Sequence, residues 1–309
     1  MKSWDVTVVG EVFADHVLSG FENWPKPGEE VVTDQYTREV GGGAAITACG
    51  LSRLGRSVNL VAVIGAIDGG WFEHRLGAFG VGADGLRKVE GNTGTTISVS
   101  TAADRSFFTY AGANRRLAEA LHKPDALAQL SQSRHVHFAM PLARSLAGEL
   151  LRALSAAGCT MSLDVGFQPH WLRDPANLNS CRAVDYLLPN EKEAALLCGS
   201  DKPEEFVAFA QKAQLRSCAL KLGARGALSI DEGMLRSVAA PPVAALDPTG
   251  AGDAFDAGFI DALLDEVSVE ERLRRACICG ALSTRFAGAL AGLPDREELW
   301  NVYEQTYGS

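Results

Sequence analysis

The sequence lacks the features that mark membrane proteins and nucleic-acid-binding proteins. No uninterrupted apolar run reaches the roughly 18 residues that a membrane-spanning helix needs. No block of lysine and arginine is present and the formal net charge is −9, which argues against nucleic acid as a partner. The first residues, MKSWDVTVVG, predict a strand and not a secretory signal. We therefore expect a cytoplasmic protein with neither membrane nor nucleic acid as a partner.

Sequence signatures of disulfides, metal clusters and common nucleotide loops are also scarce. The seven cysteines are odd in number and scattered, which favours reduced, buried thiols. His135 and His137 would share one face of a strand, and a structural role is favoured for both. A P-loop motif is absent. The single G-x-G-x-x-G, at 80–85, follows an expected helix instead of a strand and is interpreted as a turn.

An alternation of strand-like and helical segments fills the chain from residue 132 onward. It predicts an α/β fold, a parallel sheet with helices on both faces. The strands CTMSLDV (159–165) and SCALKL (217–222) are apolar on both faces, as buried parallel strands are. ALSI (227–230) and MLRSV (234–238) predict a hairpin. Helices are expected at about 43–54, 143–157, 250–265, 269–287 and 295–306.

The first third of the chain has a different pattern. Short extended stretches, EEVVTD (29–34), YTREV (36–40) and GTTISVSTAADRSFFTY (94–110), predict a small β flap with a turn at 102–105. We expect a single domain over residues 1–309 with a discontinuous β lid from about 12–40 and 92–112. A lid over the end of a sheet commonly excludes water from chemistry.

The segment DPTGAGDAFDAGF (247–259) has the context of an anion site. It follows the extended stretch PPVAAL, and Pro248 prevents a helix from starting earlier. Gly250, Ala251 and Gly252 then present backbone amides at the start of a helix, where unpaired N–H groups and the helix dipole attract anions. Their small size lets a phosphate approach the backbone.

Asp253 lies within the first turn of this expected helix, one residue beyond those amides. The dipole favours its ionised form, so it is ready to accept the proton of a substrate hydroxyl that attacks a γ-phosphate. The alternative is an acidic residue that only stabilises its helix. Chemistry alone leaves both interpretations open.

DPTGAGDAF closely resembles the C-terminal signature of the ribokinase-like (PfkB) carbohydrate kinases, with Pro248 where threonine is usual. The resemblance covers the whole chain. Further similar segments, in family order, are VVGEVFADHVL (8–18), GGGAAITACGLSRLG (41–55), AGAN (111–114), PNEKEA (189–194), KLGARGA (221–227) and TRFAGALAGLP (284–294). The resemblance implies a central, mostly parallel sheet flanked by helices with a small β lid. It also implies an ATP-dependent kinase that uses Mg²⁺.

The resemblance assigns roles to the phosphate side of the site. Asp253 would be the catalytic base, with Gly250, Ala251 and Gly252 as the anion hole. Asn190 and Glu193 match an N-x-x-E motif that helps to hold Mg²⁺, and the same pair is also a helix capping box. Residues near the nucleotide would be Gly223, Gly226, Ala287, Gly288, Ala289 and the basic Lys221, which is equally explained as a strand-end residue. Asp247 matches a position that binds a monovalent cation such as K⁺ in several relatives, and a turn-forming role explains it equally well.

The resemblance assigns fewer residues to the substrate side. Asp15 would bind sugar hydroxyls, and the backbone at Gly42 and Gly43 would approach the sugar. Ile46 stands where many members have an asparagine that contacts the sugar. Further departures are Gly43 in place of a lysine, Ala139 in place of an acidic residue, and Gly166 with Gln168 in place of a polar pair.

These departures argue against a ribose-specific enzyme and leave three functions open. The first is a kinase that phosphorylates a primary hydroxyl of a sugar or sugar derivative. The second is a nucleoside kinase on the same scaffold, and the third is a non-catalytic sugar-binding sensor. The expected partners are a small sugar-like molecule and ATP, with a homodimer through the lid as a possibility that the family offers.

Overall fold

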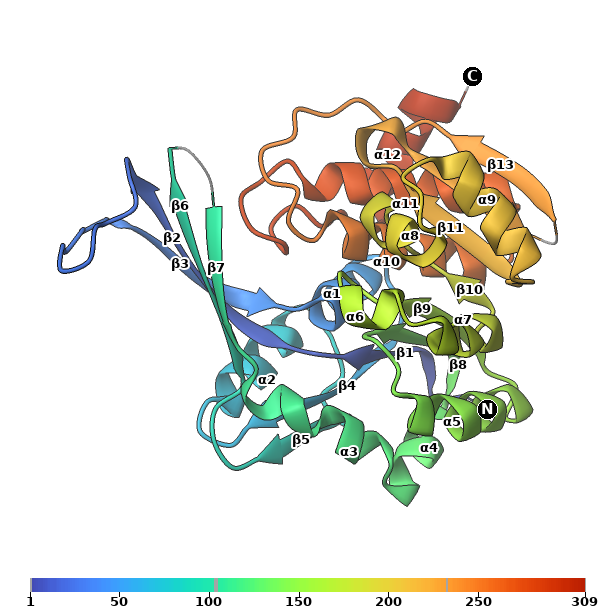
Figure 1. Cartoon of the computed structure of the whole chain (residues 1–309), viewed down its shortest axis with the longest axis horizontal. Coiled ribbons are helices and arrows are strands. Elements are labelled where there is room, and N and C mark those ends of the chain that lie inside the picture. The colour runs from blue at the N-terminus through green and yellow to red at the C-terminus, as the bar shows by residue number, and fades with distance from the viewer. Residues whose placement is uncertain (1, 103–104, 232, 309) are drawn as a thin grey trace.

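A large sheet runs through the body of the protein (Figure 1). The computed structural model describes residues 2–102, 105–231 and 233–308. Nine strands of this described chain form the sheet, namely β1 (Trp4–Gly10), β4 (Val58–Gly65), β5 (Leu86–Val89), β8 (Ser133–Ala139), β9 (Thr160–Asp164), β10 (Tyr186–Leu187), β11 (Ser217–Lys221), β12 (Ala227–Asp231) and β13 (Met234–Val238). Their order is β13-β12-β11-β10-β9-β8-β1-β4-β5.

The strands from β11 to β5 in that order are parallel, whereas β12 and β13 add an antiparallel edge. This edge is the hairpin that the sequence predicts at 227–238. Alternate residues of β1 point to opposite faces: Val6 and Val8 enter one apolar core, and Val9 enters the other. The sheet is therefore buried on both faces, as a parallel sheet requires.

Helices cover the two faces. The face that Val6 and Val8 enter, together with the cores beside it, is covered by α1 (Gly43–Arg53), α2 (Gly69–Ala78), α10 (Ala251–Leu264), α11 (Val269–Ser283) and α12 (Arg296–Tyr307). The opposite face packs against α3 (Leu117–Leu121), α4 (Pro124–Leu130), α5 (Arg144–Ala156), α6 (Pro169–Leu172), α7 (Leu178–Ala183), α8 (Glu191–Cys198) and α9 (Pro203–Lys212). None of these described helices is long and apolar enough to cross a membrane.

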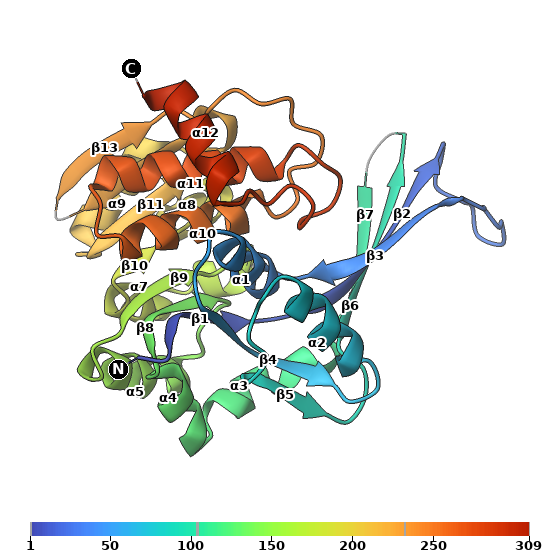
Figure 2. The ribbon, with the colours of Figure 1, turned by 180° about the vertical axis from the view of Figure 1, so that it is seen from behind.

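A second, four-stranded sheet stands away from the body in both views (Figures 1 and 2). It contains β2 (Phe13–Phe21), β3 (Gln35–Gly41), β6 (Gly94–Thr101) and β7 (Arg105–Tyr110), in the order β3-β2-β6-β7. The strands β2 and β6, which are distant in sequence, pair in parallel within this sheet. Of the turn predicted at 102–105, residues 103–104 lie outside the described residues.

Two local predictions differ from the structure. EEVVTD forms no strand: residues 22–34 link β2 to β3 and are largely exposed, with Val32 83% exposed, so no neighbouring strand pairs with them. The helix expected at 269–287 ends at Ser283. The carbonyl of Thr284 instead accepts hydrogen bonds from the amides of Leu246 (2.7 Å) and Asp247 (3.0 Å), which draws the chain into a loop.

Candidate active site

The predicted site residues gather at the carboxyl ends of the parallel strands, where open α/β sheets bind ligands. Asp164 ends β9 and Lys221 ends β11. The helices α1 and α10 begin at the same edge, with Gly42 and Gly250 as their N-caps. The first lid strand, β2, begins shortly after β1 ends. The topology therefore brings the two glycine-rich segments and the lid to one place.

The turn before α10 needs a glycine at its N-cap. Gly250 has φ 78° and ψ 2°, a left-handed conformation that glycine adopts without steric cost. A Cβ atom there would lie 2.8 Å from Cβ of Ala289 and 3.3 Å from Cδ1 of Ile46. Within the described chain no side chain caps this helix, while the Ala251 amide donates to the Pro248 carbonyl at 3.2 Å. Among the described residues, therefore, no side-chain cap competes with an anion for the amides at the start of this helix.

Asp253, the third residue of α10, lies directly against the start of α1. A Cβ atom on Gly43 would be only 2.7 Å from Oδ1 of Asp253, so the carboxylate needs the bare backbone of Gly43. The hydroxyl of Thr47 on α1 donates to the backbone carbonyl of Asp253 at 3.2 Å. The structure therefore joins the two glycine signatures through the predicted base.

The pKa of Asp253 is raised to about 7. Burial is the main cause, the negative charge of Asp164 adds to it, and the positive charge of Lys221 opposes it. The sequence predicted that the helix dipole would keep Asp253 ionised, but burial and Asp164 outweigh that effect. A pKa near neutrality suits a group that takes up and releases a proton at physiological pH.

Asn190 and Glu193 form a complete capping box at the start of α8. The Asn190 side-chain oxygen accepts from the Glu193 amide at 3.0 Å, and Oε2 of Glu193 accepts from the Asn190 amide at 2.9 Å. Oε1 of Glu193 also accepts from the Asn190 side chain at 2.6 Å. Burial first, and the charge of Asp164 second, raise the Glu193 pKa to about 7. The motif is thus locally self-satisfied while its carboxylate remains buried near Asp164.

Lys221 is turned inward. Its Nζ lies 2.6 Å from Oδ2 of Asp164 and 2.7 Å from Oδ1 of Asp256, and only 8% of the side chain is exposed. Sequence reasoning placed Lys221 near the nucleotide and assigned no role to Asp164 or Asp256. The available signal was a set of charged residues inside otherwise apolar strands and an apolar helix, positions that rarely hold unpaired charge.

Asp247 connects two loops. Its Oδ1 accepts from the amide (3.0 Å) and the hydroxyl (2.6 Å) of Thr249, and its Oδ2 accepts from the amide of Gly288 at 3.0 Å. Ala289, the next residue, packs against Gly250. Asp247 therefore holds the loop at 284–290 against the turn that precedes α10.

The other predicted nucleotide loop is a 3₁₀ turn, η3 (Gly223–Arg225), after β11. Gly226 has φ 97°, and a Cβ atom there would lie 2.0 Å from the carbonyl of Val238 on β13. Packing against the hairpin thus explains Gly226. Gly223 has φ 57° and open space around its missing Cβ.

On the lid side, Asp15 and the glycine run lie together. A Cβ atom on Gly41 would be 1.9 Å from Oδ2 of Asp15, and one on Gly42 would be 2.4 Å from the carbonyl of Glu11. Burial raises the Asp15 pKa to about 6, and a hydrogen bond with Thr96 opposes the rise. Asp15 contacts Gly41 and Asp253 contacts Gly43, so the two carboxylates flank one short backbone segment.

The side chains of Ile46, Asn114 and His137 lie around the site. Ile46 is 4% exposed and packs in the core beneath the Gly250 turn. Asn114 binds the amide (3.2 Å) and the carbonyl (2.9 Å) of Val12, which anchors the connection from β1 to β2. Asn114 belongs to the AGAN motif (111–114), for which the sequence predicts no role. Nε2 of His137 lies 3.9 Å from Oδ2 of Asp256, and burial lowers the His137 pKa to about 3, so the ring is neutral.

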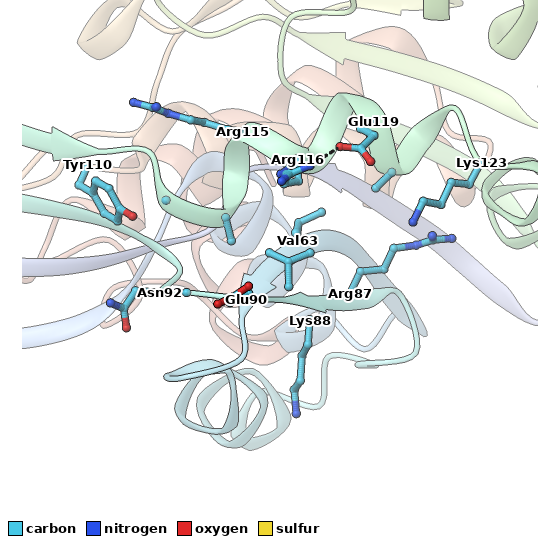
Figure 3. Close-up of a pocket in the computed structure, with 15 residues that line it drawn as sticks. Val63, Arg87, Lys88, Glu90, Asn92, Tyr110, Arg115, Arg116, Glu119 and Lys123 are labelled. Atoms are coloured by element: carbon cyan, nitrogen blue, oxygen red, sulfur yellow. Dashed lines mark hydrogen bonds and ion pairs between the residues drawn. The ribbon is translucent and has the colours of Figure 1, made fainter.

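A cavity of about 680 Å³ lies elsewhere, between β5 and the 3₁₀ turn η1 (Gly112–Arg116) with α3 (Figure 3). Several basic side chains line it, but carboxylates pair with three of them. The pairs are Arg87 with Asp125 (2.5 Å), Lys88 with Glu73 (2.8 Å) and Arg116 with Glu119 (2.9 Å). None of the predicted site residues lines this cavity.

Comparison with known proteins identifies the class. The pfkB family carbohydrate kinase model matches residues 4–296. A ribokinase from Haemophilus influenzae is 30% identical over 308 residues, covering 97% of this chain and 98% of the relative. A nucleoside kinase from Methanothermobacter thermautotrophicus is 25% identical over 309 residues, covering 98% and 97%. The structure of Arabidopsis thaliana ribokinase complexed with ribose and ATP has a TM-score of 0.86 at 27% identity, covering 97% and 98%.

The fold is therefore ribokinase-like, with the four-stranded sheet as its lid. The chain belongs to the PfkB family of carbohydrate kinases. It is a kinase of the type that transfers a phosphoryl group to an alcohol. The resemblance in the sequence is confirmed for family, fold and reaction class, whereas the roles of individual residues stay predictions.

Proposed function

We propose that the protein transfers the γ-phosphate of ATP to a primary hydroxyl of a sugar or sugar derivative, with Asp253 as the general base. One observation carries this proposal: the Asp253 carboxylate lies against the bare backbone of Gly43, beside a helix N-terminus that no described side chain caps. The base, the anion-binding amides and a close backbone approach thus meet at one point.

In this mechanism the amides of Gly250, Ala251 and Gly252 hold the γ-phosphate through hydrogen bonds and the helix dipole, the Ala251 amide sharing its hydrogen with the Pro248 carbonyl. The substrate hydroxyl, oriented by Asp15, attacks the phosphorus as its proton passes to Asp253. The bond from the γ-phosphorus to the β,γ-bridging oxygen breaks, which yields a phosphate monoester and ADP. Positioning and charge stabilisation supply most of the rate in such transfers.

ATP and Mg²⁺ are consistent with kinases of this family. The donor set fits the ion, because Glu193 and Asn190 offer the hard oxygen atoms that Mg²⁺ prefers, and each oxygen keeps a lone pair beyond its one hydrogen bond in the capping box. These two residues would hold the ion with its waters, and the ion would neutralise phosphate charge. Lys221, Gly223, Gly226, Gly288 and Ala289 stay proposed nucleotide-side residues, Lys221 acting from inside the fold.

A nucleoside is the second candidate substrate. Ile46 and Ala139 are apolar where many family members carry polar sugar contacts, and one relative with coverage of the whole chain is a nucleoside kinase. A missing polar partner leaves a substrate hydroxyl unpaired and discriminates strongly between substrates. A panel of pentoses, hexoses, sugar acids and nucleosides, assayed by ADP release, decides between the classes. Binding without turnover across the panel would favour the sensor.

Asp253→Asn tests the proposed base. Loss of a general base costs about 10²–10⁴-fold in rate, so kcat should fall by that factor while ATP still binds. Asp84→Asn, in an exposed turn just before β5, is the matched control and should keep wild-type kcat. Wild-type turnover by Asp253→Asn with its preferred substrate contradicts the mechanism.

Two further features belong to this proposal. Asp247 would bind a monovalent cation, so kcat should rise when K⁺ replaces tetramethylammonium in the assay.

The lid carries exposed apolar side chains, including Val32 (83% exposed), Phe107 (60%) and Phe108 (54%), and we propose a homodimer through it. Sedimentation velocity reports the dimer directly. We further propose that residues 1–309 form a single kinase domain with its discontinuous lid.

A further inference from the structure

Lys221 occupies an unusual position for a residue that was expected to face the nucleotide. It ends β11, and β10 separates that strand from β9, which ends at Asp164. Lys221 therefore reaches past the end of β10 to meet Asp164 at the end of β9. It also reaches α10 on the covering layer. One side chain thus bridges two strand ends and the helix that carries the predicted base.

Its ammonium group donates hydrogen bonds to Asp164 and to the Gly252 carbonyl, and it forms an ion pair with Asp256. Nζ lies 2.6 Å from Oδ2 of Asp164, 2.7 Å from Oδ1 of Asp256, and donates to the Gly252 carbonyl at 3.3 Å. The side chains of Asp164 and Asp256 are 11% and 0% exposed. All three contacts of the ammonium thus lie within the protein, and only 8% of the Lys221 side chain is exposed.

Charge explains why the ammonium is kept. Burial by itself lowers the Lys221 pKa, but the charges of Asp164, Asp256 and Glu193 outweigh burial and raise it, so the group stays protonated. Two buried carboxylates next to each other would repel without it. Burying a charge is costly unless the charge is paired. The ammonium pairs with Asp164 and lowers the pKa of that carboxyl, whereas burial raises the pKa of Asp256 well above its usual range.

We propose that Lys221 is a positioning residue of the kinase: it fixes the first turn of α10 from inside the fold and so aims Asp253 and the anion-binding amides. The inference rests on the proposed function. Gly252 lies immediately before Asp253, and Asp256 lies three residues after it, so the ammonium contacts the helix on both sides of the base. Thr47 on α1 holds the carbonyl of Asp253 from another direction.

This arrangement makes catalysis sensitive to a group that touches neither substrate. A shift of about 1 Å in a reacting group can cost roughly 10²-fold in rate. The turn before α10 has no side-chain cap in the described structure. Hydrogen bonds within the turn and from Asp247 hold its entry, and the Lys221 contacts hold the first helical turn that follows. The same ammonium acts on the base electrostatically. The titratable groups that face Asp253 are Asp164 on β9, Lys221 on β11, Glu193 on α8 and Asp256 on α10 itself, whereas α1 presents the uncharged Gly43.

Lys221→Met tests the proposal, because methionine keeps a stem of similar length and removes the ammonium. We expect a fall in kcat of about 10²-fold, with the KM values for ATP and for the acceptor within about threefold of wild type. The acid limb of the pH–kcat/KM profile should move to higher pH, because Asp253 loses the positive charge that favours its ionised form. Arg216→Met is the matched control, since Arg216 lies just before the opposite end of β11 in an exposed pair with Asp185.

Asp164→Asn is the second variant and keeps the test valid if Lys221→Met does not fold. Asp164 raises the pKa of Asp253, so its neutralisation should move the acid limb to lower pH, opposite to the lysine variant. A purely structural role would lower kcat equally at every pH and leave both limbs in place, which would overturn the proposal. A raised KM for ATP with wild-type kcat would identify a nucleotide ligand and would also overturn it.

The outcomes separate this inference from the proposed function. If Asp253→Asn keeps wild-type kcat, the general-base mechanism fails and the positioning role fails with it. If Asp253→Asn is inactive while Lys221→Met and Asp164→Asn both show wild-type kinetics and pH profiles, only the positioning role is overturned. Circular dichroism and thermal unfolding of each variant establish that the compared proteins are folded.

Discussion

The helix α10 and the lid hold the two carboxylates of the proposed site, Asp253 and Asp15, in different ways. Asp253 lies in a dense polar framework, with Lys221, Asp164 and Thr47 fixing the helix around it. Asp15 lies on a lid strand, held by contact with the Gly41 backbone and a hydrogen bond with Thr96. The proposed phosphate side is therefore held by several polar contacts, whereas the proposed acceptor side depends on few polar groups.

This difference suggests how one scaffold serves several acceptors. Phosphoryl transfer needs the same donor and base geometry for every acceptor, so its framework is buried and over-determined. Acceptor choice needs only a few groups on a separate sheet, and such groups can change without disturbing the base. Variants on the two sides should accordingly affect different kinetic constants.

The largest effect in this comparison is expected from Gly43→Ala, where the two sides meet. The new Cβ atom would lie 2.7 Å from Oδ1 of Asp253 and would displace the base. We expect kcat to fall by about 10²-fold. Gly77→Ala on α2 is the control, because nothing lies within 4 Å of its added Cβ atom. An unchanged kcat in Gly43→Ala would show that the carboxylate can move without loss of function.

Asp15→Ala is expected to have a smaller effect, and on the KM for the acceptor instead of kcat. A hydrogen bond to a charged group contributes about 1.5–3 kcal/mol, so the KM for the acceptor should rise by roughly 10- to 100-fold. The KM for ATP should not change. Asp34→Ala, an exposed residue before β3, should leave both constants at wild-type values. A matching rise in the ATP KM would break the proposed separation between the two sides.

The smallest effect is one of stability and depends on pH. The Asp253 pKa is about 7 in the folded protein and lies near 3.8 without burial. Below about pH 4 the carboxyl is protonated in both states, so its raised pKa does not destabilise the fold. As pH rises from about 4 to about 7, only the unfolded state releases the proton, so the folded state loses stability. Asp253→Asn should therefore gain on the order of 1–3 kcal/mol in unfolding free energy at pH 8 and almost nothing at pH 4. Urea unfolding at both values measures this, and equal stabilities at pH 8 would contradict the raised pKa.

Much of the site was predictable because its parts are local. A glycine-rich turn after an extended segment and before an apolar helix specifies an anion-binding N-terminus within a few residues. The positions of α1, α5, α10 and α12 follow from their apolar periodicity in the same way. The lid's two segments were also recognisable, although 29–34 forms no strand, because strand formation depends on a partner that the local pattern does not reveal.

By itself, the sequence determined the class of fold, the family and the segment that carries the predicted base, because these depend on local patterns and ordered motifs. Tertiary structure alone decided the direction of Lys221, its pairing with Asp164 and Asp256, and the raised pKa of Asp253. The physical reason is that desolvation and buried charge pairing depend on which distant segments the fold brings together. A helix dipole can be inferred from neighbouring residues, whereas the burial that opposes it cannot.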